Sequence, residues 1–240
     1  AGASPRGLAF ATAHAECIFI GGDQPKKIRQ QVDKIRELAV QQGRQASDIK
    51  IFLGITVVTG ETEQIAQEKL AEYRQYASPE AGLAHYASSV GMDLSKFADD
   101  EIIPYQKSNS IASVNEKFKT QQITKNDLKN QHVLGGRYPL IVGSGSHVAQ
   151  QLIDLMDDTG IDGFNLTRTV APESHQNFIR FVVPELQQRG RYKTEYQAGS
   201  LRHKLHQQGD RLAASHPADA FRCRPLKQEK SSHLSQHISA

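Results

Sequence analysis

The feature that most constrains this fold is a repeated switch between strand-like and helix-like hydrophobic spacing. Short apolar or β-branched runs at 17–20, 49–58 and 163–167 indicate buried strands. Apolar residues at helical spacing follow each of the first two runs, and another such segment, over 148–156 and ended by Gly160, precedes the third. Parallel strands need helical crossovers of this kind. The sequence therefore predicts an α/β fold.

Prolines and glycines predict where the elements begin and end. Ser4 and Pro5 are typical of the N-cap and first position of a helix that continues over 8–15. Gly54 indicates a bulge in the second strand. Pro184 predicts a kink or restart in the last helix, which begins near Glu173.

Residues 80–138 interrupt the alternation with a polar stretch that contains only short helical patches, at 81–90 and 114–120. Connections in compact domains are usually far shorter, so we expect an insertion or a lid. The predicted organisation is a main part over 1–205, including this insertion, and a basic, His-rich tail over 206–240.

Three clear strands, with residues 1–4 as the end of a fourth, amount to half of an eight-stranded barrel. A closed (β/α)₈ barrel typically needs about 250 residues. Two interpretations remain open, a small doubly wound sheet and a barrel whose first part is missing. The chain starts without Met, which favours a fragment of a longer protein.

Charge and hydropathy exclude several classes. Mean hydropathy is −0.52 and no apolar run approaches the roughly 20 residues of a membrane helix. The formal charge of +3 comes from a basic segment after residue 190, whose aromatic residues are too few for a nucleic-acid arm. We expect a solvated tail. The two cysteines suggest a reducing, cytoplasmic setting, with Cys17 a buried apolar residue and no favoured disulfide.

Two glycine- and serine-containing turns could bind an anion, because free N–H groups and the helix dipole meet at a helix N-terminus. One contains Ser4, where a plain cap and a phosphate site both stay open. The other is 143–146, which we interpret mainly as a helix cap. His14, His85 and His147 are interpreted as packed or surface residues. No metal-site spacing or catalytic motif is present, so the catalytic residues stay unknown.

Several motifs carry a resemblance to one enzyme family. They are AGASPRGLAFATAHAE (1–16) followed by CIFIGG, SDIKIFLGITVVTGETEQIAQEKLAEY (47–73), GMDLS (91–95), VGSGSHVAQQLIDLMDDTGIDGFNL (142–166), FVVPELQQRGRYKTEYQAGSLRHKL (181–205) and AASHPA (213–218). In this order they resemble the C-terminal half of the flavin-dependent monooxygenases of the nitrilotriacetate monooxygenase component A and dibenzothiophene-sulfone monooxygenase family, within the bacterial-luciferase-like superfamily.

The resemblance implies a TIM (β/α)₈ barrel of which this chain is the C-terminal half. It implies a two-component enzyme in which a separate NAD(P)H-dependent flavin reductase supplies reduced FMN. Oxygen would then form a flavin C4a-hydroperoxide that oxidises a small organic substrate. Ala3 and Ser4 match the family's contact to the FMN phosphate, and the full-length family form implies a homo-oligomer. No nucleic-acid or membrane partner is expected.

The resemblance also makes the 80–138 insertion a substrate lid, with Tyr86, Tyr105 and Asn109 as candidate pocket-lining residues. The alternative is a non-catalytic α/β remnant whose edges serve interactions at most. Because half a barrel leaves strand edges unpaired and a core uncovered, we expect this chain alone to be poorly soluble or oligomeric. A monodisperse monomer that melts cooperatively would contradict that expectation.

Overall fold

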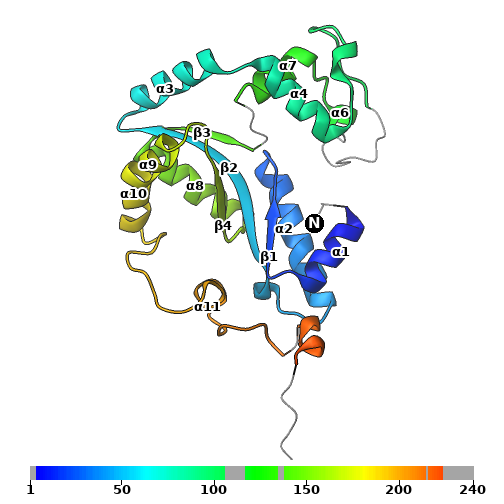
Figure 1. Cartoon of the computed structure of the whole chain (residues 1–240), viewed down its shortest axis with the longest axis vertical. Helices are drawn as coiled ribbons and strands as arrows, with labels where there is room; N and C mark the ends of the chain where they lie inside the picture. The colour runs from blue at the N-terminus through cyan, green and yellow to red at the C-terminus, as the bar shows by residue number, and fades with distance from the viewer. Residues whose placement is uncertain (1–3, 106–116, 135–137, 215, 224–240) are drawn as a thin grey trace, which may run out of the picture.

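The computed structural model of the protein describes residues 4–105, 117–134, 138–214 and 216–223 (Figure 1). Helices and strands alternate along most of the chain, so the predicted α/β class is confirmed. The elements of the main part are α1 (Pro5–His14), β1 (Cys17–Ile20), α2 (Pro25–Gln41), η1 (Ala46–Asp48), β2 (Lys50–Gly60), α3 (Glu63–Tyr76), β3 (Leu140–Ser144), α8 (Gly145–Thr159), β4 (Gly163–Thr167), α9 (Glu173–Asn177), η3 (Phe178–Val182) and α10 (Val183–Gln188).

Four parallel strands form the sheet of the described residues, and the long strand β2 pairs with all the others. β1 pairs with the first half of β2, Lys50 to Leu53, and β3 with the second half, Thr56 to Gly60. β4 pairs with residues 52–56 of β2. Three strands were predicted and are confirmed. β3 was missed, because only three apolar residues precede its Gly-Ser end.

The two faces of this sheet differ in how they are covered. Ile51 and Leu53 of β2 are buried with α2, and Ile55 and Val57 are buried with α8. The opposite face contains Phe19, whose side chain is 46% exposed. Cys17 lies on that face and is also exposed, so the prediction that it is buried was wrong.

Gly54 does not make the predicted bulge, because its pairing with β4 continues without interruption. The glycine instead allows Tyr138 to lie against the sheet: a Cβ on Gly54 would lie 2.5 Å from Cδ1 of that ring. Tyr138 also packs edge-on against Phe19, with ring centroids 5.5 Å apart. The less covered face is therefore partly filled by a side chain from the segment before β3.

The last helix of the main part confirms the effect predicted for Pro184. Backbone hydrogen bonding changes to a π-helical turn over Phe178–Val182. An ordinary α-helix, α10, then restarts with Pro184 in its first turn, where a missing N–H is tolerated. Gly160 ends α8 in the left-handed conformation, with φ +70°, as its position after the apolar face predicts.

The segment between α3 and β3 has a hydrophobic core of its own. Its described elements are α4 (Pro79–Val90), η2 (Leu94–Lys96), α6 (Lys117–Thr120) and α7 (Lys125–His132). Leu83 and Leu128 are buried in this core, and α4 packs on α7. Figure 1 shows these helices beyond the end of the sheet. The helical patch over 81–90 is confirmed, whereas 114–116 of the other patch lie outside the described residues.

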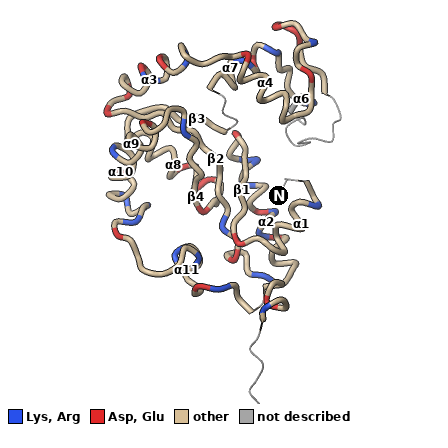
Figure 2. Tube along the Cα trace, viewed as in Figure 1, with Lys and Arg blue, Asp and Glu red and all other residues tan. Residues whose placement is uncertain are grey.

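The described segment from residue 201 onward contains α11 (Leu201–His206), which spans the predicted boundary between main part and tail, and η4 (Pro217–Phe221), which lies in the tail. Its side chains are largely exposed and rich in Lys and Arg (Figure 2). This segment contacts the start of the chain: the Arg202 guanidinium donates to the Glu16 carboxylate at 2.8 Å, and His216 Nε2 lies 3.0 Å from the His14 carbonyl oxygen. In the part of the chain that is described, no helix is long and apolar enough to cross a membrane.

Candidate functional site

The carboxyl ends of the four parallel strands lie at one edge of the sheet, where ligands of α/β folds bind. α3 starts shortly after β2 and α8 directly after β3, so both N-termini lie at this edge. α1 ends two residues before the amino end of β1 and runs back along it, so its N-terminus points toward the same edge (Figure 1). The N-termini of α3 and α8 therefore lie at the carboxyl edge, and the N-terminus of α1 points in the same direction.

Ser4 is the N-cap of α1, as predicted. Its Oγ accepts a hydrogen bond from the Gly7 N–H at 3.1 Å, and Pro5 occupies the first helical position. The hydroxyl proton of Ser4 is left to donate elsewhere, and the N–H of Arg6 is the first donor of the helix because Pro5 has none. The first turn contains no acidic residue. Ala3, the other predicted phosphate contact, lies outside the described residues.

The N-terminus of α8 has an anion of the protein's own. Glu63 Oε1 accepts hydrogen bonds from the Ser144 N–H and Oγ, both at 3.0 Å, and lies 2.7 Å from His147 Nδ1. These bonds, led by the Ser144 N–H, hold the pKa of Glu63 below its ordinary value. Gly143 permits the approach, because a Cβ there would lie 2.9 Å from a Glu63 carboxylate oxygen. The 143–146 turn is thus the helix cap that was predicted.

The predicted tyrosines of the insertion have different surroundings. Tyr86 is 2% exposed in the insertion's core and stacks on His132, so it is a packing residue and does not line a pocket there. Tyr105 is 38% exposed, with Lys119 Nζ 4.4 Å from its ring centroid. Asn109 lies outside the described residues. His85 is exposed and His14 packs on Phe10, as predicted.

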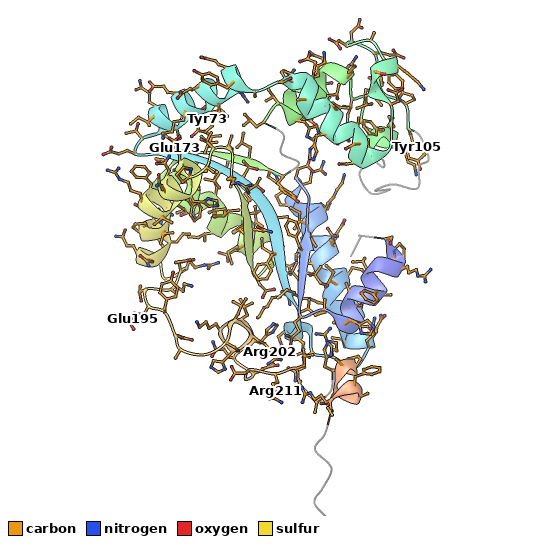
Figure 3. The ribbon with its side chains drawn as sticks, viewed as in Figure 1. Tyr73, Tyr105, Glu173, Glu195, Arg202 and Arg211 are labelled. Atoms are coloured by element: carbon orange, nitrogen blue, oxygen red, sulfur yellow. The ribbon has the colours of Figure 1, made fainter. Side chains whose placement is uncertain are left out.

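A polar cluster joins α3 to the helix that follows β4. Glu173 of α9 accepts hydrogen bonds from Lys69 and Tyr73 of α3 and, at 3.3 Å, from Asn177. Burial, then the bond to Glu173, raises the pKa of Tyr73, whereas Lys69 chiefly lowers the pKa of Glu173. Figure 3 shows Tyr73 and Glu173 close together where the two helices meet. The cluster fixes α3 at the carboxyl edge.

A cavity of about 210 Å³ lies between β2, α3 and the end of α7. Its described lining is Thr56, Arg74, Asn130, Gln131, Val133, Leu134, Tyr138 and Leu140. Partial desolvation by its neighbours, followed by the nearby Glu16 carboxylate, raises the pKa of the exposed Cys17 and disfavours the reactive thiolate. Both cysteines are free, and the described residues contain no group of three or more His, Cys, Asp or Glu that could hold a metal ion.

Comparison with known proteins decides the family. The sequence model of the luciferase-like monooxygenase family matches residues 1–163, about two thirds of the chain. This protein belongs to the luciferase-like monooxygenase family. The predicted relationship is thereby confirmed, and dibenzothiophene-sulfone monooxygenase and nitrilotriacetate monooxygenase component A are both among the relatives of this family member.

Two relatives of this luciferase-like protein match most of its length. The long-chain alkane monooxygenase of Geobacillus thermodenitrificans is 39% identical over 92% of this chain. The dimethyl-sulfide monooxygenase of Hyphomicrobium sulfonivorans is 38% identical over 92%, and its crystal structure superposes with a TM-score of 0.81. A riboflavin lyase structure with modified FMN and riboflavin, 33% identical over 93% of the chain, gives 0.83 and 50% coverage of that structure. The chain spans about half the length of the curated relatives it matches, 47% of each of the first two.

Sequence reasoning on this luciferase-like chain missed the Glu63–Ser144–His147 contact, the Lys69–Tyr73–Glu173 cluster and the cavity around Thr56. Each joins residues more than 70 positions apart in the chain. One signal was available: Glu63 stands in the first turn of a helix that follows a strand, and a carboxylate at this edge stabilises any helix N-terminus that lies near it.

Proposed function

We propose that this chain is the C-terminal part of a reduced-FMN-dependent monooxygenase barrel. The barrel oxidises a small organic substrate with O₂, a separate NAD(P)H-dependent flavin reductase supplies reduced FMN, and the assembled enzyme is a cytoplasmic homo-oligomer. Its family and the alkane and sulfide monooxygenases it resembles support this function. A relative named as component A of a monooxygenase suits a separate reductase. The insertion over 80–138 is the lid of the substrate site.

The single observation that carries the proposal is the N-terminus of α1. Ser4, Arg6 and the backbone of Ala3 are the groups that would hold the FMN phosphate. A Ser hydroxyl that already accepts the Gly7 N–H can donate its proton to a phosphate oxygen, and Arg6 adds a positive charge. With no carboxylate in the first turn, nothing there repels the dianion. These residues fit the phosphate.

FMN, when bound, supplies the oxygen chemistry of the reaction. The residues of this chain have three tasks. The α1 N-terminus holds the phosphate end, and the aromatic pair Tyr138 and Phe19 covers part of the open sheet face. The Lys69–Glu173 ion pair holds α3, which the insertion follows, against α9.

FMN titration followed by quenching of flavin fluorescence tests this function. The titration uses the chain alone and the chain joined to the N-terminal half of a relative. Ser4→Ala removes one charge-assisted hydrogen bond, so we expect roughly tenfold weaker binding. Ser78→Ala is the matched control. Ser78 also precedes a proline, Pro79, and its Oγ caps α4 by accepting a 3.1 Å hydrogen bond from the N–H three residues later.

The control should lose helix stability as Ser4→Ala does and leave FMN affinity unchanged. Absence of saturable FMN binding in both forms of the protein would contradict the proposed function and favour a non-catalytic remnant. Equal weakening by Ser4→Ala and Ser78→Ala would contradict the assignment of the phosphate to α1.

A further inference from the structure

The segment after α10 returns along the amino ends of the strands. We call its described residues from 200 to 223, which contain α11 and η4, the strap. Figure 1 shows the strap at the lower end of the sheet, where β1 and β2 begin. The Arg202 guanidinium anchors the first part of the strap, because its Nε and Nη2 both donate to the Glu16 carboxylate just before β1.

His216 holds the second part of the strap with both nitrogens of its ring. Its Nε2 lies 3.0 Å from the carbonyl oxygen of His14, in the last turn of α1. Its Nδ1 lies 3.1 Å from the backbone nitrogen of Ala218, at the start of η4. A backbone carbonyl only accepts a hydrogen bond, and a backbone N–H only donates one. The ring is therefore neutral, with its proton on Nε2 and a lone pair on Nδ1.

Protonation of the His216 ring is incompatible with these contacts. The cation carries a proton on Nδ1 as well, which places one donor against another at the N–H of Ala218. η4 then loses its N-cap bond, because the His216 side chain is the group that caps it. A histidine in a released, solvated strap has no such conflict and takes up a proton near the ordinary pKa of about 6.5. Acid therefore favours release.

A second histidine of the strap has the same sign of pH dependence. His206 is the last residue of α11, and burial lowers its pKa, so its neutral form is favoured while the strap is docked. The charges near it have opposite effects, since Glu16 and Asp48 favour the cation whereas Arg202 and Lys50 oppose it.

The charged groups near His216 come from η4 and from the end of α1. On η4, Asp219 forms an ion pair with Arg222 at 3.0 Å, so the carboxylate already has a cation beside it. At α1, Arg44 Nη1 donates to the Thr12 carbonyl at 2.8 Å and adds a positive charge, and the titratable His14 ring packs on Phe10. Two arginines thus offset the one carboxylate that favours a protonated His216.

We propose that the strap is a pH-sensitive latch, docked on the end of α1 while His216 is neutral and released from it in mild acid. Carboxylates stay ionised above about pH 5. The Arg202–Glu16 ion pair therefore persists through this range and keeps the released segment attached to the start of β1. This inference goes beyond the proposed function and does not depend on it.

Hydrogen–deuterium exchange of the 240-residue chain, followed by mass spectrometry between pH 8 and pH 5.5, tests the release. Labelling times are scaled to the intrinsic exchange rate at each pH. Peptides that cover 216–222 should lose about tenfold in protection toward pH 5.5, because two hydrogen bonds of His216 are lost. Peptides of β2 should keep their protection, since the sheet does not depend on the latch.

Two variants assign the effect to one ring. His216→Asn keeps a side-chain oxygen that can cap η4 and cannot titrate in this range, so protection over 216–222 should be the same at both pH values. His203→Asn is the matched control in the same strap, because the His203 ring forms no hydrogen bond with another described residue. This control should keep the native pH response.

Selective ¹⁵N labelling of the histidines tests the tautomer in the native chain, without any variant. At pH 8 the ring-nitrogen shifts should place the His216 proton on Nε2. A proton on Nδ1 would overturn the inference. So would equal protection of 216–222 at pH 8 and pH 5.5, an unchanged pH response in His216→Asn, or a parallel loss in β2, which would show acid unfolding of the whole chain.

Discussion

Two helices of this protein begin with Ser-Pro, and the next residue determines what their N-termini can bind. α1 begins Ser4-Pro5-Arg6 and α4 begins Ser78-Pro79-Glu80. In each helix the serine Oγ accepts a hydrogen bond, 3.1 Å long, from the N–H of the residue three positions later. In α4, Glu80 supplies a carboxylate whose pKa is lowered, first by a hydrogen bond from its own N–H. In α1 the same position is a cation.

α8 extends the comparison, because the carboxylate of Glu63 binds at its N-terminus from another helix. A carboxylate of the protein thus lies at the N-termini of α4 and α8. The N-terminus of α1 has Arg6 and no acid in its first turn. The difference is the one that the proposed phosphate site at α1 requires.

The largest effect is expected when the N-terminus of α1 receives the negative charge that Glu80 gives to α4. Arg6→Glu replaces an attraction for phosphate with a repulsion at a helix N-terminus, so we expect about a hundredfold weaker FMN binding by fluorescence titration. Lys34→Glu, an equal change in net charge in the middle of α2, is the control. Similar losses in both variants would attribute the effect to net charge and would contradict a site at α1.

Gly145→Ala disturbs the closed N-terminus of α8. A Cβ at Gly145 would lie 2.1 Å from the Phe181 carbonyl oxygen of the π-helical turn, and backbone cannot move aside as a side chain can. We expect a loss of about 1 to 3 kcal/mol in the free energy of unfolding, measured by urea denaturation. Gly190→Ala is the control with open space around it, although its φ of +67° adds a smaller strain. An unchanged midpoint for Gly145→Ala would show that α8 and the π turn separate easily.

The same glycines show how far the sequence could predict this fold. Gly160 ends a helix for local reasons, so its role was predicted. Gly54 and Gly145 are required by Tyr138 and Phe181, which lie 84 and 36 positions away along the chain. Local spacing contains no information about such contacts, which is why Gly54 was interpreted as a bulge.

The candidate site likewise has one part that the sequence predicts and another that it does not. The Ser4 cap is a contact between residues three apart and was predicted. The Glu63 contact to α8 depends on β3 pairing next to the end of β2, and β3 was not predicted. Without that strand, nothing in the sequence brings Glu63 and Ser144 together. The cavity around Thr56 was missed for the same reason, because Leu140 of β3 is part of its wall.

The two Ser-Pro caps also make a matched pair for stability. Ser4→Ala and Ser78→Ala each remove one cap of the same geometry, so each should lower the free energy of unfolding by about 1 kcal/mol. Saturating phosphate should stabilise the native chain and less so the Ser4→Ala variant, with Ser78→Ala responding as the native chain does. Thermal melts with and without phosphate measure both effects. An equal phosphate response in all three would contradict a difference between α1 and α4.

The smallest expected effect is a pH dependence of the stability that Glu63 contributes at the N-terminus of α8. The pKa of Glu63 is lowered in the folded chain, first by the Ser144 N–H. The unfolded carboxyl, with an ordinary pKa of about 4.3, therefore binds a proton more readily than the folded one. The stability that Glu63 contributes is fully present above that value and is lost as the pH falls through the folded pKa.

Thermal melts between pH 6 and pH 3 should show this loss as part of the acid destabilisation of the native chain. Glu63→Gln should have a lower Tm at pH 6 and a shallower decline toward pH 3, so that the two curves approach each other. Glu68→Gln changes a carboxylate on the same helix that, among the described residues, accepts from Gln64 one turn away, and it should keep the native slope. Parallel curves for Glu63→Gln and the native chain would mean that the α8 N-terminus gains nothing from the carboxylate, and that it resembles α1 more than α4.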